Sequence, residues 1–180
     1  LGTAPSPGVA PAWVRPDLTS SLDLAQRASG ILNRELIFEK PADLILRENV
    51  DHRQREMRGL TRQSLSWVED FEDIVAVLNE SERYSEWPDV IDLLRDSVRR
   101  GPRTARALRE SMEAKYGNRG EELYELLWKY DAEELPAEAA KQLVQYLEDE
   151  VLACRVLSFS NLNRITGLGY YYRPQENELE

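Results

Sequence analysis

Apolar residues recur every three or four positions along most of this chain, which is the spacing of one face of an α-helix. Leu22, Ala25, Leu32 and Leu36 form the first such stripe, and similar stripes follow as far as Ile165. The chain shows no sustained alternation of apolar and polar residues, which is the pattern of a half-buried strand. The pattern therefore predicts an all-α fold of about nine short helices.

Turn-forming residues mark where these helices begin and end. Gly101 followed by Pro102 ends one helix as a left-handed cap, and Gly117 and Gly167 end two others. The first predicted helix follows a cap at Thr19, Ser20 or Ser21 and runs to about Leu36, and the fifth follows a cap at Ser85 and stops at Gly101. The other predicted helices cover residues 41–48, 52–68, 71–81, 103–116, 120–130, 137–148 and 150–166. The expected domain organisation is a proline-rich linker or arm over 1–17, a helical-repeat domain over 18–168 and a C-terminal tail over 169–180.

A short signature of an apolar residue, an arginine, any residue and a leucine recurs in these helices. It occurs at residues 57–60 and returns 97 residues later at 154–157, with a looser copy at 105–108 about halfway between. The predicted repeat positions are Arg58, Arg106 and Arg155. The alternative is coincidence, because amphipathic helices share a period of 3.6 residues and arginine is abundant here.

The signature resembles the helix of HEAT and armadillo repeats, over residues 41–81 and 136–167 and more weakly between them. The run Ile165-Thr166-Gly167 and the tail Tyr172-Arg173-Pro174 are also similar to the ends of uncharacterised bacterial HEAT-like proteins. The resemblance implies a right-handed α-solenoid whose stacked helices form an interaction surface and carry no known activity. Val156 departs from the pattern, because the repeat usually has a small residue there.

Composition narrows the classes of protein that fit. The 180 residues are 42% hydrophobic with a net charge of −10, which indicates one folded domain and argues against binding of nucleic acid over the whole surface. No apolar window is long enough to cross a membrane, so no membrane contact is expected within this segment. Because the chain starts with Leu1 and a proline-rich run, we expect a piece of a larger or membrane-anchored polypeptide; the compartment stays open.

The residues needed for familiar catalytic and metal sites are scarce. His52 is the only histidine and Cys154 the only cysteine, too few for a structural zinc site or a helical di-iron site. Cys154 lies in an apolar helical stretch, which favours a core position over a nucleophile. No Gly-Lys pair is present for a phosphate-binding loop. The sequence therefore predicts no catalytic residues, no metal and no cofactor.

Charge is unevenly distributed along the chain. Residues 93–109 carry six arginines and one aspartate, a net of +5, whereas residues 110–150 carry a net of −8. The arginines are Arg95, Arg99, Arg100, Arg103, Arg106 and Arg109. One interpretation is a basic patch for an anionic partner, with Arg99, Arg100, Arg103 and Arg106 as the binding residues. The other is pairing of these arginines with acidic residues of the same chain.

Aromatic residues provide the remaining candidates. Tyr84 and Trp87 stand at a loop-to-helix junction and are predicted to be exposed partner-binding anchors. Trp67, Trp87 and Trp128 are expected in core or rim packing, which is the alternative to an exposed anchor for Trp87. Tyr170 to Tyr172 are expected to cover the last helix.

These observations favour a non-enzymatic module for protein–protein interaction or scaffolding, with a protein partner and an open oligomeric state. The alternatives are a hydrolase or metal-dependent enzyme on a helical bundle, and a binder of anionic ligands through Arg95–Arg109. Nucleic acid is the weaker anionic ligand, because no aromatic residue is interleaved with these arginines.

Overall fold

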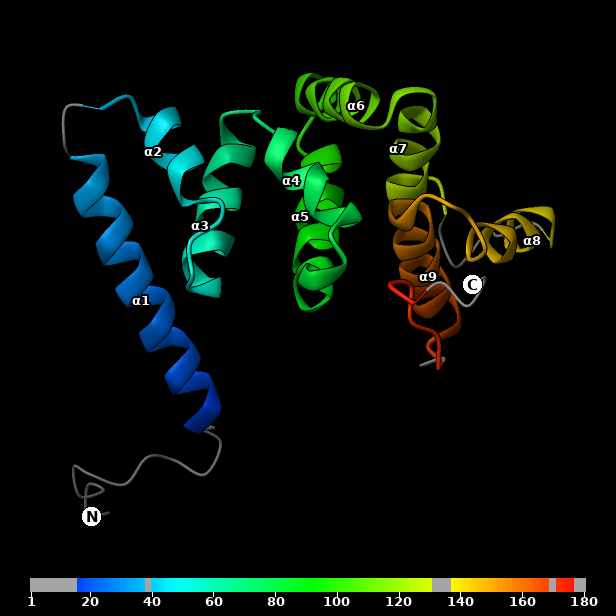
Figure 1. Cartoon of the computed structure of the whole chain (residues 1–180), viewed down its shortest axis with the longest axis horizontal. Helices are drawn as coiled ribbons and strands as arrows, with labels where there is room; N and C mark the ends of the chain where they lie inside the picture. Colours follow the sequence, from blue (N-terminus) through cyan, green and yellow to red (C-terminus); the bar gives the residue numbers. More distant parts are fainter. Residues whose placement is uncertain (1–15, 38–39, 131–136, 169–170, 177–180) are drawn as a thin grey trace, which may run out of the picture. The chain divides into compact units, whose positions relative to one another are not determined.

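The computed structural model describes residues 16–37, 40–130, 137–168 and 171–176, and the described residues form helices and 3₁₀ turns without any strand (Figure 1). The all-α prediction is confirmed. The chain divides into two compact units, Leu1–Thr61 and Arg62–Glu180.

The first unit contains α1 (Pro16–Leu36), α2 (Ala42–Asn49) and the start of α3 (Arg55–Trp67). Its buried apolar residues are Ala28, Leu32, Ile45, Leu46 and Met57. A polar contact joins α1 to α2, because Asn49 donates from Nδ2 to Glu35 Oε2 at 2.7 Å. The helix α1 begins at Pro16, which the sequence analysis placed in the arm, and proline fits the first turn of a helix because its missing N–H has no partner there.

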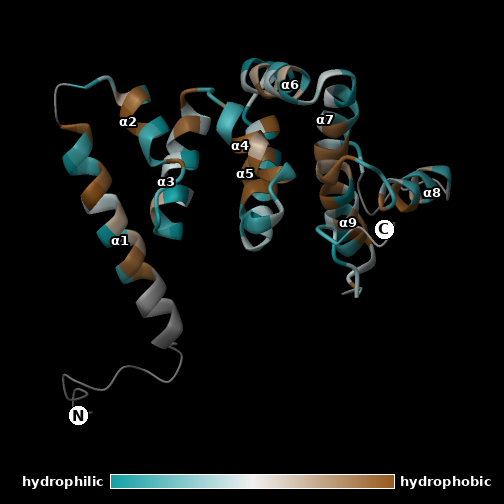
Figure 2. Ribbon diagram, viewed as in Figure 1, coloured by the Kyte–Doolittle hydropathy of each residue, from teal (hydrophilic) through white to brown (hydrophobic). Residues whose placement is uncertain are grey.

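The second unit continues with α4 (Glu72–Ala76), two 3₁₀ turns (Val77–Asn79 and Ser81–Glu86), α5 (Trp87–Arg99), α6 (Pro102–Tyr116), a 3₁₀ turn (Gly117–Arg119), α7 (Gly120–Trp128), α8 (Ala137–Tyr146) and α9 (Leu152–Thr166). The helix predicted over 71–81 is instead a short α-helix that tightens into a 3₁₀ turn. In Figure 2 these helices carry both hydrophobic and hydrophilic residues, as amphipathic packing requires.

The helix α9 lies at the centre of the second unit, where it packs against α5, α7, α8 and the 3₁₀ turn Val77–Asn79. Six consecutive residues of α9, from Ala153 to Ser158, are buried, so this helix is enclosed on all sides at its N-terminal half. Arg155 and Asn161 of α9 find hydrogen-bond partners inside the protein, and these partners organise the site described below.

A close approach between α6 and α7 fixes the neighbouring corner. A Cβ atom on Gly120 would lie 2.4 Å from Glu113 Cα, a distance that backbone atoms cannot tolerate. Only glycine allows α7 to start this close to α6, which places Leu123, Leu126 and Leu127 in the core.

Candidate functional site

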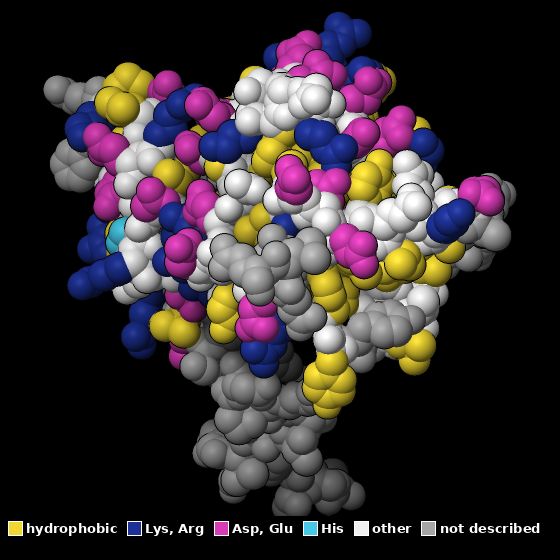
Figure 3. Space-filling model, turned by 45° about the vertical axis from the view of Figure 1, so that its right-hand side comes forward, with side chains coloured by type: hydrophobic (Ala, Val, Ile, Leu, Met, Phe, Trp, Pro, Cys, Tyr) yellow, Lys and Arg dark blue, Asp and Glu magenta, His cyan; other side chains and the backbone are white. Residues whose placement is uncertain are grey.

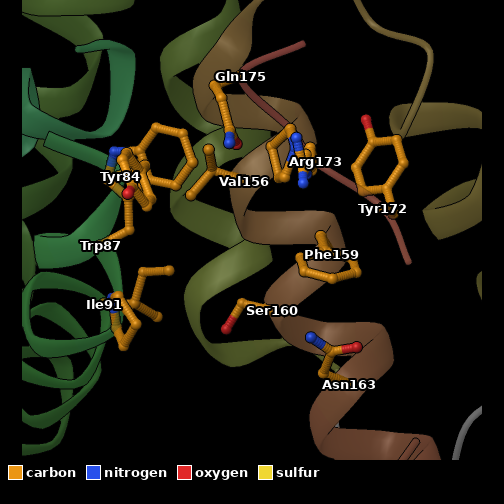
Figure 4. A pocket seen from close by; sticks show the side chains of 12 residues that line it. Tyr84, Trp87, Ile91, Val156, Phe159, Ser160, Asn163, Tyr172, Arg173 and Gln175 are labelled. Carbon is orange, nitrogen blue, oxygen red and sulfur yellow. The ribbon is translucent and has the colours of Figure 1, made fainter. Parts of the chain in front are cut away.

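The second unit contains a groove of about 490 Å³ between the start of α5, one face of α9 and the C-terminal tail (Figure 4). It is lined by Tyr84, Trp87, Pro88, Ile91, Val156, Phe159, Ser160, Asn163, Tyr172, Arg173, Pro174 and Gln175. Figure 4 shows Tyr84, Trp87 and Ile91 on one side, with Val156 and Ser160 projecting toward them from α9. Most of the lining is apolar or aromatic, which is typical of a binding groove.

Two aromatic residues form the α5 side of the groove with different exposure. Tyr84 is 57% exposed and stands at the groove mouth, as predicted for an anchor. Trp87 is only 6% exposed, so its predicted exposure is wrong. The reason is a tertiary contact, since the indole Nε1 donates to the Val77 carbonyl at 2.9 Å and draws the ring into the wall.

The opposite wall is one face of α9. Val156, Phe159, Ser160 and Asn163 are three or four residues apart and so share a side of the helix. Behind this wall, Arg95 on α5 donates from Nη2 to Asn161 Oδ1 at 3.0 Å and to Ser160 Oγ at 3.2 Å. These bonds hold the two walls of the groove at a fixed separation.

The Arg95 guanidinium is buried, and its electrostatic surroundings are unfavourable for charge. Burial, and after it the neighbouring charge of Arg164, lower the pKa of Arg95 to about 10, against a smaller raising effect of Asp92. The group stays cationic at neutral pH and keeps its hydrogen bonds. Asn161 completes the network by donating from Nδ2 to the Leu126 carbonyl at 2.7 Å.

The C-terminal tail closes one end of the groove. Arg155 donates from Nε to the Pro174 carbonyl at 2.9 Å, and the Tyr172 hydroxyl donates to the Leu147 carbonyl. The rings of Tyr172 and Phe159 lie 5.2 Å apart, centroid to centroid. Tyr172 thus covers α9 as predicted, whereas Tyr171 is fully exposed and Tyr170 lies outside the described residues.

Arg173 supplies an exposed charge at the rim of the groove. Its side chain is 70% exposed and pairs with Glu176 at 2.7 Å. The hydrogen bond that Arg173 donates to the Glu176 carboxylate raises the pKa of Arg173, with a smaller contribution from Tyr84 on the other side of the groove. A carboxylate of a bound molecule can replace Glu176, because solvent screens an exposed pair of this kind and little stability depends on it.

The candidates for catalysis do not meet in this groove. His52 belongs to the first unit, where its Nδ1 accepts a hydrogen bond from the Gln54 N–H at 3.1 Å. Cys154 is completely buried, and burial raises the pKa of its thiol to about 11. Among the described residues, no group of three or more His, Cys, Asp or Glu side chains could hold a metal ion.

The arginine-rich segment is largely engaged within the second unit. Arg95 is buried, Arg99 pairs with Asp96 at 3.3 Å, and Arg103 pairs with Glu69 at 2.8 Å. Arg109 binds Glu113 at 2.7 Å and Glu121 at 2.8 Å. Figure 3 shows basic and acidic side chains intermixed on the face that it presents. Internal contacts therefore account for four of the six arginines, all except Arg100 and Arg106.

Arg100 lies over an aromatic ring, which sequence order alone does not show. Its guanidinium carbon is 4.6 Å from the ring centroid of Trp67, although the two residues belong to different helices. Trp67 is 68% exposed and Trp128 54% exposed, so of the two expected positions, core or rim, the structure excludes the core for both. Arg106 is exposed on α6.

The predicted repeat positions Arg58 and Arg155 make the same hydrogen bond. Each donates from Nη1 to the carbonyl six residues earlier, Arg58 to His52 at 2.7 Å and Arg155 to Asp149 at 2.6 Å. The side chains of those earlier residues also match, since His52 Nδ1 and Asp149 Oδ1 each accept from the N–H two residues later. In the part of the chain that the structure describes, Arg106 shows no corresponding bond.

Sequence reasoning missed the α9 wall and the tail residues Arg173 to Gln175. The spacing of residues 156, 159, 160 and 163 was the available signal, but it marks a helix face without showing what that face meets.

Comparison with protein-family models, curated proteins and solved structures found no match for this chain. Of the helices that the structure describes, none has the length and apolar character needed to cross a membrane.

Proposed function

We propose that this protein is a non-enzymatic interaction module in which the groove between α5, α9 and the tail binds an extended segment of a partner protein. The observation that carries the proposal is the lining of the groove, which is aromatic and aliphatic with a few polar groups at its edge. A volume of about 490 Å³ accommodates two or three large side chains, which fits a peptide segment.

The charge at the rim specifies the chemistry of the partner. Arg173 is exposed, and its one described ion pair is to a nearby residue of the tail. A partner segment with large apolar side chains followed by a carboxylate would fill the groove and pair with Arg173. Tyr84 would cover the bound segment from the opposite edge.

We further propose that the chain is a HEAT- or armadillo-like solenoid built from repeated helix pairs. The support is a correspondence between α2–α3 and α8–α9 at an offset of 97 residues. The N–H of Val50 donates to the Arg47 carbonyl, and the N–H of the equivalent Leu147 donates to the Val144 carbonyl. In the same way, the N–H of His52 donates to the Asn49 carbonyl, and the N–H of Asp149 donates to the Tyr146 carbonyl. Helices α2 and α8 end at matching positions, and α3 and α9 begin at matching positions. Open groove surfaces between stacked helix pairs are the usual binding sites of such arrays.

A binding assay on the full chain tests the groove. The probe is a fluorescein-labelled decapeptide with two leucines, a phenylalanine and a following aspartate, monitored by fluorescence anisotropy. We expect Tyr84→Ala and Arg173→Glu each to weaken binding about tenfold. Tyr171→Ala is the matched control, because Tyr171 is an exposed aromatic residue next to the groove lining but outside it.

Two outcomes would contradict the proposal. One is no binding of the peptide at about 1 mM, the weakest affinity that a specific groove should show. The other is an equal effect of Tyr84→Ala and Tyr171→Ala, which would mean that the peptide contacts aromatic side chains without using the groove.

A further inference from the structure

A second surface of the unit Arg62–Glu180 combines an exposed tryptophan with clustered arginines. Trp67, the last residue of α3, is 68% exposed, and the following Val68 is 61% exposed. Large aromatic residues that remain in contact with water on a folded protein commonly mark an interaction site. We call the surface formed by Trp67, Arg99, Arg100 and Arg103 the Trp67 surface.

Arg100 orders the tryptophan ring and adds charge to it. Its guanidinium carbon stands 4.6 Å from the ring centroid, within the range of a cation–π contact. The same guanidinium also donates a hydrogen bond to Ser97 Oγ, so the side chain is held from two sides. The surface is therefore a preorganised pair of an aromatic ring and a cation.

Arg103 extends the positive charge beside this pair. Its Nε lies 2.8 Å from Glu69 Oε2, and Glu69 is two residues from Trp67 in the chain. Glu69 also accepts a hydrogen bond from Thr104 Oγ1 at 3.2 Å, which ties the end of α3 to the first turn of α6. The side chain of Arg103 nevertheless remains 90% exposed, so its other guanidinium nitrogens face solvent.

Arg99 and Arg106 flank the pair on the two helices that meet here. Arg99 ends α5 and is 69% exposed in its pair with Asp96, and Arg106 lies one helical turn after Arg103 on α6. The three arginines of the Trp67 surface therefore share two described carboxylate partners, Asp96 and Glu69. The surface keeps an excess of positive charge in a chain whose net charge is −10.

We propose that the Trp67 surface binds an acidic segment of a partner protein, separately from the groove. An apolar side chain of the segment would pack on Trp67 and Val68, and its carboxylates would pair with Arg99 and Arg103 in the bidentate manner that guanidinium favours. A short acidic peptide fits better than nucleic acid, because a phosphate chain longer than the surface would meet the acidic remainder of the protein.

The test uses the full chain and a fluorescein-labelled nonapeptide of eight glutamates around a central leucine, followed by fluorescence anisotropy at 50 mM salt. We expect Trp67→Ala and Arg103→Gln each to weaken binding at least fivefold, and 0.5 M salt to abolish it. Trp128→Ala is the matched control, since Trp128 is also exposed but stands beside the Lys129–Glu125 pair without a stacked arginine. Both tryptophans are exposed, so neither change should unfold the protein, and circular dichroism checks this.

Three results would overturn the proposal: no binding of the acidic peptide at about 1 mM, equal weakening by Trp67→Ala and Trp128→Ala, or tighter binding of a ten-nucleotide oligothymidine than of the peptide. The last result would indicate a nucleic-acid surface instead. Tyr84→Ala should leave binding of the acidic peptide unchanged, so this experiment and the groove experiment can fail independently.

Discussion

The loops that lead into α3 and α9 have the same hydrogen-bond frame but different surroundings. In each, an arginine of the helix holds the carbonyl six residues earlier, and a side chain at that earlier residue accepts from the N–H two residues later. Arg155 has two additional acceptors, the carbonyls of Glu150 and Pro174, and is 6% exposed, whereas Arg58 is half-buried. The hydrogen bonds of the loop thus depend on the loop sequence, whereas the burial of the arginine depends on what packs over the loop.

The burial of equivalent apolar residues also differs between α3 and α9. Leu65 of α3 is buried and Leu60 is half-buried, while in α9 the equivalent of Leu60, Leu157, is fully buried and Leu162 is half-buried. The helix face that enters the core is therefore rotated between the two pairs, although the loops that precede them match.

The largest expected losses of stability come from replacing the buried leucines of α3 and α9. Replacing Leu65 or Leu157 with alanine should each lower the free energy of unfolding by about 3 kcal/mol, because a cavity remains at a fully packed site. The same change at Leu60 or Leu162 should cost about 1 kcal/mol, since water already reaches these side chains. Urea unfolding of the four variants measures the difference. Equal losses at Leu60 and Leu157 would mean that the two helices bury the same face.

The second prediction concerns the shared arginine. Arg155→Ala removes three hydrogen bonds to backbone carbonyls, one in the tail and two in the loop before α9, and should destabilise the protein by about 2 kcal/mol. Arg58→Ala should cost about 1 kcal/mol. Arg106→Ala is the control from the same sequence signature, and its exposed side chain predicts a change within about 0.5 kcal/mol. If Arg106→Ala matched Arg58→Ala, the loop hydrogen bond would not be the source of the stability.

These comparisons show which features were accessible from sequence. The helices followed from apolar periodicity, because a helix must bury one stripe whatever it packs against. The arginine signature at 57–60 and 154–157 was also visible, since it depends on a local loop. The 3₁₀ turns over residues 77–86 were missed, because Arg83 adopts a non-helical backbone conformation inside a stretch of helix-forming composition.

The candidate sites depended on contacts between distant residues and were only partly accessible. Tyr84 was identified from its position at a helix start, but the burial of Trp87 depends on the Val77 carbonyl. The contact between Trp67 and Arg100 joins the end of α3 to the end of α5. These two residues are 33 positions apart in the chain, so no spacing rule could reveal the contact. The tail residues line the groove because Arg155 binds the Pro174 carbonyl, which is again a tertiary contact.

A third prediction uses the titratable residue that only one helix carries. Met57 and Cys154 are equivalent and completely buried, but only the cysteine can ionise. Burial raises the pKa of Cys154 from 9.0 to about 11, and this outweighs the lowering by the Arg119 hydrogen bond at 3.4 Å. The thiol of the unfolded chain therefore ionises at a lower pH than the thiol of the folded protein. Below pH 9 this leaves the free energy of unfolding unchanged, and between pH 9 and 11 it lowers the free energy of unfolding.

The measurement is the pH dependence of urea unfolding for the natural chain and for Cys154→Ala. Burial also raises the pKa of Tyr116 and Tyr130, so these tyrosines add to the pH dependence of unfolding, and the difference between the two proteins isolates the thiol. We expect the alanine variant to lose about 1–2 kcal/mol less between pH 9 and pH 11. Parallel curves for the two proteins would show that the thiol ionises as easily in the folded state as in the unfolded state.

The smallest expected effect concerns how the two helices end. Glu69 follows α3 with φ of 64° and Gly167 follows α9 with φ of 63°, so both ends use the left-handed conformation, but only one uses glycine. Gly167→Ala should destabilise the protein by about 1 kcal/mol, because a Cβ atom is strained there while the space around it is open.

Glu69→Gly should relieve a similar strain but lose the contacts to Arg103 and Thr104, for a net change within about 0.5 kcal/mol. Because salt screens the Arg103 pair, Glu69→Gly should become stabilising relative to the natural chain in 1 M salt. A Glu69→Gly variant that is destabilised equally at low and high salt would show that the Thr104 hydrogen bond, and not the ion pair, keeps glutamate at this helix end.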